Sequence, residues 1–196
     1  RSSDLMIKEL SELRDRFGDK RLTDISDAEA SIDNEDLLPQ ENILVVLTKN
    51  GYIKRMSDNT FRTQNRGGRG IKGITTSGND IVRLLVHTFT HTDILFFSSF
   101  GTVYRMRGYQ IPDASRDGKG IPAINLLNLD QEEKIVAILA CDDYPEDNYL
   151  FFATVGGVVK RTTMSAFASI HSNGKRALSL REGDALLDVK RTDKAS

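Results

Sequence analysis

The stretch Ile-Leu-Val-Val-Leu-Thr-Lys-Asn-Gly-Tyr-Ile-Lys-Arg occupies residues 43–55 and decides the fold, because versions of it occur three times. Each version begins with an apolar run, at residue 43, 93 or 149, and a glycine follows eight residues later. The glycines Gly51, Gly101 and Gly157 each open the pattern Gly-x-(Ile/Val)-x-Arg. Two runs of strand residues around a glycine that accepts positive φ predict a β-hairpin in each copy.

The repeat continues beyond the hairpin. A second glycine follows each first one by seventeen residues, and a basic residue comes next, as Gly68-Arg69, Gly118-Lys119 and Gly174-Lys175. A final apolar strand closes each unit, near residues 81–86, 135–139 and 186–189. We therefore predict strand, tight turn, strand, Gly/basic loop, short strand, turn and strand. Four strands in a unit of this length are typical of a propeller blade.

The predicted fold class is mostly β, a propeller-like arrangement of four-stranded blades preceded by a short N-terminal helix. Three blades fit the chain, at residues 43–92, 93–148 and 149–196. Propellers typically close with four to eight blades. We therefore interpret the chain as a fragment, or as a chain that pairs to complete its sheets. Such pairing would be self-association through exposed blade edges.

The residues before the first repeat have a different pattern. A stripe of apolar residues four, three and four apart predicts a helix over residues 4–17, formed by Met6, Leu10, Leu13 and Phe17. We expect this stripe to be core against a missing domain. Residues 28–42 are acidic and predict a linker, with one short strand at Ile32 or at Leu37-Leu38.

The net charge of −1 hides an asymmetry along the chain. Residues 1–42 hold 6 Lys/Arg and 12 Asp/Glu, a net of −6, whereas residues 43–196 hold 21 and 16, a net of +5. The basic excess of the repeat region favours a polyanionic partner.

The sequence also excludes several classes of function. It contains no phosphate-cradling P-loop, no Gly-x-Ser-x-Gly and no Cys-His pairing, so we predict no catalytic residue, no metal site and no cofactor in this chain. No apolar run approaches the ~18 residues that span a bilayer, and we expect no membrane contact. The single cysteine, Cys141, excludes an internal disulfide framework and suits a reducing cytosol.

The first Gly/basic loop is the most elaborate copy: Gln64-Asn65-Arg66-Gly67-Gly68-Arg69-Gly70. Its glycines let the backbone come close to a phosphate chain, and its two guanidinium groups can bind phosphates. The heptad resembles the gyrase A box, the Gln-Arg-Arg-Gly-Gly-Arg-Gly motif in the family of bacterial DNA gyrase A proteins. Asn65 departs from the usual basic residue, so this heptad has one basic side chain fewer than the motif.

The resemblance extends over the whole chain and implies a β-pinwheel of six blades, of which residues 43–196 look like the first three. Residues 1–27 look like the end of the helical segment of the breakage-reunion domain. By this resemblance, a basic rim wraps duplex DNA without sequence preference in the cytoplasm, at the nucleoid. The implied partners are the rest of the gyrase A protein and the gyrase B protein, in a heterotetramer.

The same resemblance implies a type IIA topoisomerase as the parent enzyme. Its ATP and Mg would act through other domains, and its DNA-cleaving tyrosine would lie upstream of residue 1. We therefore expect this chain alone to be inactive in cleavage and ATP hydrolysis.

The predicted DNA-binding residues are the heptad and five further basic residues. Lys119, Lys175 and Arg176 fall on predicted loops. Lys54 and Lys160 alternate with apolar residues along their predicted strands, so we expect them on the opposite face of the strand. The series Arg55, Arg105 and Arg161 has two interpretations, DNA contact or hydrogen bonding to carbonyls at blade seams. Two alternative functions also remain at this level, a protein-interaction propeller and the equivalent domain of topoisomerase IV.

Overall fold

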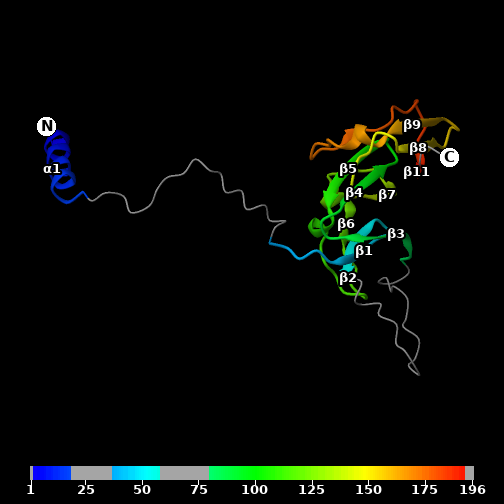
Figure 1. Ribbon diagram of the computed structural model, residues 1–196, viewed down its shortest axis with the longest axis horizontal. Coiled ribbons are helices and arrows are strands. Elements are labelled where there is room, and N and C mark those ends of the chain that lie inside the picture. The colour runs from blue at the N-terminus through cyan, green and yellow to red at the C-terminus, as the bar shows by residue number, and fades with distance from the viewer. Residues whose placement is uncertain (1, 19–36, 58–79, 193–196) are drawn as a thin grey trace, which may run out of the picture. The chain divides into compact units, whose positions relative to one another are not determined.

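The computed structural model of the 196-residue chain describes residues 2–18, 37–57 and 80–192. The chain divides into two compact units, Arg1–Asn34 and Glu35–Ser196. The first contains helix α1 (Ser2–Phe17), and the second contains every strand of the described residues (Figure 1).

Helix α1 confirms the helix predicted for residues 4–17. Arg14 and Arg16 in its last turn complement the helix dipole. The helix ends at Gly18, whose N–H donates to the Arg14 carbonyl over 2.8 Å. The four side chains of the predicted stripe are 53 to 69% exposed. A packing partner for this stripe therefore stays a prediction.

Three antiparallel sheets form the second unit, as the repeat predicts. The first has the order β3-β1-β2-β6 (Val82–Phe89, Asn42–Thr48, Tyr52–Ser57, Ile121–Pro122). The second has the order β10-β5-β4-β7 (Lys175–Arg176, Thr102–Arg107, Asp93–Ser98, Ile135–Cys141). The third has the order β11-β8-β9 (Leu186–Thr192, Tyr149–Thr154, Val159–Thr163). The turn at Leu37-Leu38 replaces the strand expected there, and Ile32 lies outside the described residues.

The three predicted hairpins are β1–β2, β4–β5 and β8–β9. Gly51, Gly101 and Gly157 take φ values of 83, 78 and 80°. Each of these glycines donates its N–H to the carbonyl three residues earlier over 3.0 to 3.1 Å. A residue with a Cβ is strained at such a φ, so the repeated glycine is the residue that makes each turn.

In the second and third repeats, the short strand at the Gly/basic loop does not join the sheet that its own repeat forms. β6, from the second repeat, pairs with β2 of the first sheet, and β10, from the third repeat, pairs with β5 of the second sheet. The four strands of one sequence unit are therefore not the four strands of one sheet, which corrects the simple unit-by-unit prediction. Periodicity detects a two-residue strand, but it cannot determine which sheet edge that strand joins.

The core lies in the two seams between successive sheets. Every residue of β4 is buried, because the middle sheet is covered on both faces. Ile94 and Phe96 face the seam with the first sheet, and Leu95 and Phe97 face the seam with the third. The second seam is aromatic, with Phe97, Phe152 and Phe167 ring centroids 5.7 to 6.2 Å apart.

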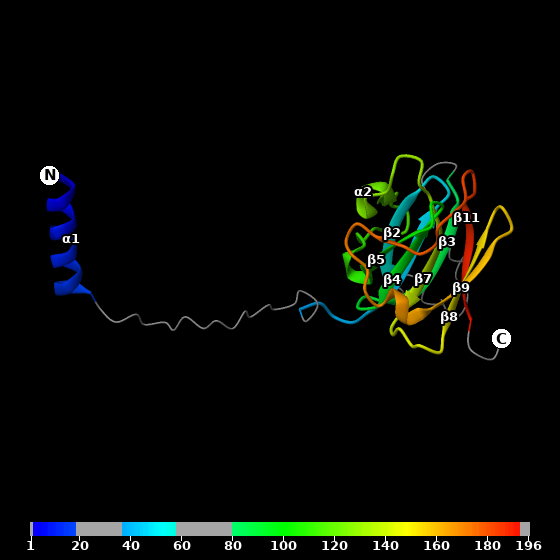
Figure 2. The ribbon, with the colours of Figure 1, turned by 90° about the horizontal axis from the view of Figure 1, so that it is seen from above.

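Short helical turns line the seams, namely η2 (Gly108–Gln110), α2 (Ala123–Leu127) and η3 (Met164–Phe167). The closing strand β7 lies against both β3 and β11, so the closing strands follow one another through the stack (Figure 1). Seen from above, the three strands overlap on one side of the unit (Figure 2). Sheets, hairpin turns and closing strands thus repeat through the described part of this unit.

Candidate nucleic-acid interface

The heptad falls outside the described residues. Its seven members, Gln64, Asn65, Arg66, Gly67, Gly68, Arg69 and Gly70, belong to the interval 58–79, and their role in DNA binding stays a prediction. The two equivalent loops, at Gly118-Lys119 and Gly174-Lys175, are described.

Lys119 is exposed at the loop that leads into β6. Its Nζ lies 4.2 Å from the centroid of the Tyr52 ring on β2, a cation–π contact between the second repeat and the first sheet. The next residue, Gly120, has a φ of 78°, and a Cβ there would lie 2.4 Å from the Ile53 carbonyl oxygen. The tight pairing of β6 with β2 therefore holds Lys119 at the surface.

Lys175 and Arg176 form β10 and are both exposed. The Lys175 ammonium donates to the carbonyls of Ala166, over 2.6 Å, and Ser169, over 3.4 Å. Because ammonium has three donors and this side chain is exposed, these bonds orient the cation without removing it from solvent.

Lys160 is exposed on β9 and donates to the Ala177 carbonyl over 3.1 Å. Among the described residues, β9 pairs with β8 on one side only. Lys160 thus keeps the exposure predicted for it.

Lys54 corrects a sequence prediction. Its side chain does not point to solvent: the residue is 1% exposed. Its ammonium donates to the carbonyls of Ser115, Arg116 and Gly118 over 3.3, 2.7 and 2.8 Å. Desolvation lowers the pKa of Lys54, and the Asp117 carboxylate opposes that shift. Lys54 therefore fastens the loop of the second repeat to the first sheet. The alternation of side chains along β2 predicts the face on which Lys54 lies, but the loop of the second repeat covers that face.

Two of the three repeated arginines fit the seam interpretation. Arg55 donates to the Tyr109 carbonyl over 3.4 Å, and Arg105 donates to the Ala168 carbonyl over 2.9 Å. Each acceptor belongs to the repeat that follows. Arg161 lies on the third sheet and stacks over the Tyr149 ring, with its Cζ 4.4 Å from the centroid. Where a following repeat is present, the arginine of the series therefore connects its own repeat to that one.

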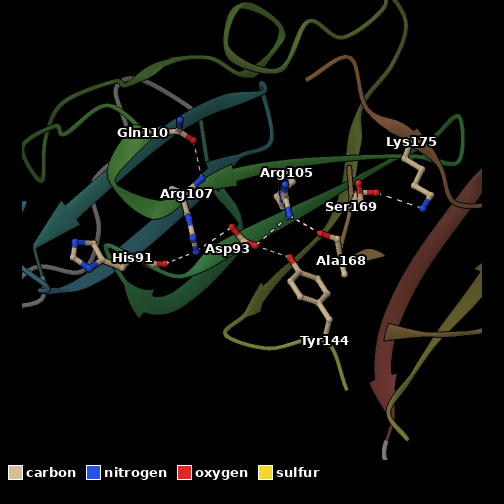
Figure 3. Close-up of polar contacts among 9 residues, drawn as sticks. All are labelled: His91, Asp93, Arg105, Arg107, Gln110, Tyr144, Ala168, Ser169 and Lys175. Atoms are coloured by element: carbon tan, nitrogen blue, oxygen red, sulfur yellow. Dashed lines mark hydrogen bonds and ion pairs between the residues drawn. The ribbon is translucent and has the colours of Figure 1, made fainter. Parts of the chain in front are cut away.

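A cluster that the sequence analysis missed lies at the second seam (Figure 3). Asp93, at the start of β4, accepts a hydrogen bond from the Tyr144 hydroxyl over 2.8 Å. Its carboxylate also contacts Nη1 of Arg105 at 3.6 Å and Nη1 of Arg107 at 3.3 Å. Arg107 further donates from Nη1 to the His91 carbonyl and from its backbone N–H to Gln110, each over 2.8 Å. The Arg-x-Arg spacing on β5 was the signal that could have revealed this cluster.

Within residues 2–18, 37–57 and 80–192, no group of three or more His, Cys, Asp or Glu side chains is placed to hold a metal ion. Cys141 is buried, and burial raises the pKa of its thiol to about 11, which disfavours the reactive thiolate. None of the described helices combines the length and apolar character that a membrane crossing requires.

Comparison with known proteins connects this geometry to one family. Residues 42–86, 92–142 and 148–193 match the family model described as DNA gyrase C-terminal domain, beta-propeller. The chain is 47% identical over 190 residues to the DNA gyrase A protein of Halalkalibacterium halodurans, covering 97% of this chain and 23% of that protein. Identity is also 47% to the DNA gyrase A protein of Staphylococcus aureus, covering 96% of this chain and 21% of that protein. The chain thus spans less than a quarter of these relatives.

Solved structures agree on the fold. The C-terminal domain of DNA topoisomerase IV superposes with a TM-score of 0.66 at 22% identity, over 80% of this chain and 47% of that one. A DNA gyrase A C-terminal domain superposes with a TM-score of 0.59 at 28% identity, over 79% of this chain and 49% of that one. The fold is therefore shared by both kinds of protein, while the sequence similarity at 47% is to the DNA gyrase A protein.

Proposed function

This chain belongs to the DNA gyrase C-terminal domain family, and from that premise we propose that it binds and wraps duplex DNA without sequence specificity. In the whole protein, the wrapped DNA would be presented for ATP-dependent negative supercoiling. The rest of the gyrase A protein and the gyrase B protein would be its partners, in the cytoplasm. ATP and Mg would act through other domains of the holoenzyme.

One observation carries the proposal: equivalent Gly/basic loops place exposed cations at the same position of successive repeats. Lys119 and Lys175 each follow the second glycine of a repeat. Lys119 comes just before β6 and Lys175 begins β10, and both of these strands join the preceding sheet. Duplex DNA carries about one charge per 1.7 Å, so a surface that follows it needs cations at repeated intervals. Such contacts go mainly to phosphates and position DNA without identifying its bases.

The heptad gives this path its strongest predicted contact. Its position in the first repeat is that of Gly118-Lys119 and Gly174-Lys175 in the next two. Arg66 and Arg69 would each bind a phosphate, and the weaker basic loops would continue the path. Wrapping would then favour deformable DNA, as for other proteins that bend the duplex.

The proposal is tested with a labelled duplex titrated at several salt concentrations, together with a circularisation assay in which linear DNA is closed by ligase in the presence of the chain. We expect affinity to fall steeply with salt and to differ little between sequences. The double variant Arg66→Ala/Arg69→Ala should lose the wrapped topology and keep the β-sheet circular dichroism of the parent chain.

A matched control is Arg14→Ala/Arg16→Ala, which removes the same charge from α1. It should leave the wrapped topology intact. Affinity that stays constant between low and moderate salt would contradict the electrostatic mechanism. Wrapped topology in the heptad variant would exclude the heptad's role.

A further inference from the structure

The second seam contains a polar pocket that none of the predicted DNA-binding residues lines. It has a volume of about 270 Å³ and is lined by Asp93, Arg105, Met106, Arg107, Gln110, Ile170, His171 and Ser172. The first five residues belong to the second repeat, and the last three belong to the third. We call it the seam pocket.

The cations of the seam pocket are held in place and remain accessible. Nη1 of Arg105 is fixed by Asp93 and the Ala168 carbonyl, and Nη1 of Arg107 is fixed by Asp93 and the His91 carbonyl. The side chains of Arg105 and Arg107 are nevertheless 31 and 41% exposed, whereas that of Asp93 is 12% exposed. The buried carboxylate thus brings two guanidinium groups together, which reduces the entropy cost of binding an anion.

The equivalent pocket at the first seam shows that this charge is particular to the second seam. That pocket measures about 160 Å³, and its charged residues are Arg55, Glu41 and Asp113, a sum of −1. The seam pocket has two arginines and one aspartate, a sum of +1 with His171 neutral. Ser57 of the first repeat stands where the second has Arg107, fourteen residues after the start of each segment. The two seams share their architecture, and only the second suits an anion.

The seam pocket adjoins a residue already assigned to the DNA path. Arg105 binds the carbonyl of Ala168, and Lys175 binds the carbonyls of Ala166 and Ser169. Figure 3 shows Ala168 and Ser169 between Arg105 and Lys175. Arg105 and Lys175 therefore bind carbonyls of the same short segment, residues 166–169.

We propose that the seam pocket binds a backbone phosphate of duplex DNA through Arg105 and Arg107. This inference rests on the proposed function and extends it to a site that the Gly/basic loops do not include. A guanidinium fork binds phosphate in a defined geometry, so the pocket would fix the register of the duplex between two repeats. The exposed side chains of Gln110 and Ser172 can add neutral hydrogen bonds to the same phosphate.

Two variants of the full chain test the site by duplex titration over a range of salt. Arg107→Ser installs the residue of the first seam and should lower the salt slope by about 0.9 and the affinity by roughly five- to tenfold. Gln110→Glu keeps an acceptor for the Arg107 N–H and adds a negative charge beside the pocket. It should lower the affinity at least threefold without lowering the thermal midpoint. Arg107→Lys should recover only part of the affinity lost in Arg107→Ser.

Arg16→Ser on α1 is the matched control for loss of one positive charge. If Arg107→Ser and Gln110→Glu bind DNA as the parent chain does while Arg66→Ala/Arg69→Ala does not, the seam pocket is excluded and the proposed function stands. If the parent chain shows no salt-dependent DNA binding, the phosphate site in the seam pocket and the proposed function are both excluded.

A titration with inorganic phosphate in the absence of DNA distinguishes two ligands of the pocket, a DNA backbone phosphate and a free phosphate ion. The NMR signals of Arg107 and His171 report the binding. Weak shifts that do not saturate are expected for a site that takes its phosphate from the duplex. Saturation at micromolar phosphate would assign the pocket to a free anion and overturn the inference.

Discussion

At the scale of single residues, one repeat position has three different environments. Lys54 is buried and binds three carbonyls of the following repeat. Tyr104, at the same position of the second repeat, is buried and donates to Glu133 over 2.9 Å. Lys160, in the third, is exposed. The difference follows from what covers each strand, since the covering segment comes from the next repeat.

Replacing Lys54 tests whether it is structural. Lys54→Met keeps the length of the side chain but leaves three carbonyls without their donor, and we expect it to lower the free energy of unfolding by about 1–3 kcal/mol. Lys160→Met, at the exposed equivalent, should change it by less than about 0.5 kcal/mol. Urea unfolding followed by circular dichroism measures both.

Lys54→Met also distinguishes a basic residue that holds two repeats together from one that contacts DNA. At temperatures where it is folded, Lys54→Met should keep the salt slope of DNA binding, whereas Lys119→Ala should lower it by about 0.9. A lowered slope in Lys54→Met would restore the phosphate contact that the sequence analysis predicted.

At the scale of elements, the first two sheets are each completed by a strand from the next repeat. β2 receives β6, and β5 receives β10. β9 is the equivalent strand of the third sheet, and it has no second neighbour among the described residues. It carries the exposed Val159, at 61%. An unpaired edge with exposed apolar residues is prone to pair with another chain.

We accordingly expect two copies of this chain to associate through β9. Light scattering should give a mass above the 21.9 kDa of one chain as concentration rises. Val159→Lys places a charge on that edge and should return the mass to that of a monomer. Monomer mass for the parent chain at every concentration would show that the edge is protected.

At the scale of the whole molecule, stability depends on the seams, and the middle sheet takes part in both. Tyr104, Cys141 and Tyr144 are partly or fully buried around this sheet. Burial, then hydrogen bonding to Glu133 or Asp93, raises the pKa of Tyr104 and of Tyr144 above the ordinary 10.0. Burial raises the pKa of Cys141 to about 11 from 9.0.

These shifts predict a loss of stability in alkaline solution. As pH rises past the ordinary pKa values, the unfolded chain loses protons that the folded chain keeps, so the free energy of unfolding falls from about pH 9 upward. Urea midpoints measured between pH 7 and 11 should show this fall. Tyr144→Phe should be less stable at pH 7 by about 1 kcal/mol, through loss of the bond to Asp93, and less sensitive to alkaline pH. An equal sensitivity would contradict the contribution of Tyr144.

Much of this architecture was predictable because it depends on local patterns. The spacing of Gly51, Gly101 and Gly157 predicted three hairpins, and the closing strands were found near their actual positions. The exposure of Lys119, Lys160 and Lys175 also followed from the pattern. The cluster around Asp93 did not, because its members come from β4, β5 and the loop at Tyr144, which only folding brings together.

The sequence by itself determined the repeat, its turns, the basic loops and the family, since hydrophobic periodicity and glycine spacing act over short stretches of chain. Only the tertiary structure decided that β6 and β10 join the preceding sheets, that Lys54 is buried, and that Arg105 and Arg107 share one carboxylate. Each of these depends on which distant segment covers a given strand, and that is settled by packing between repeats rather than by the pattern within one.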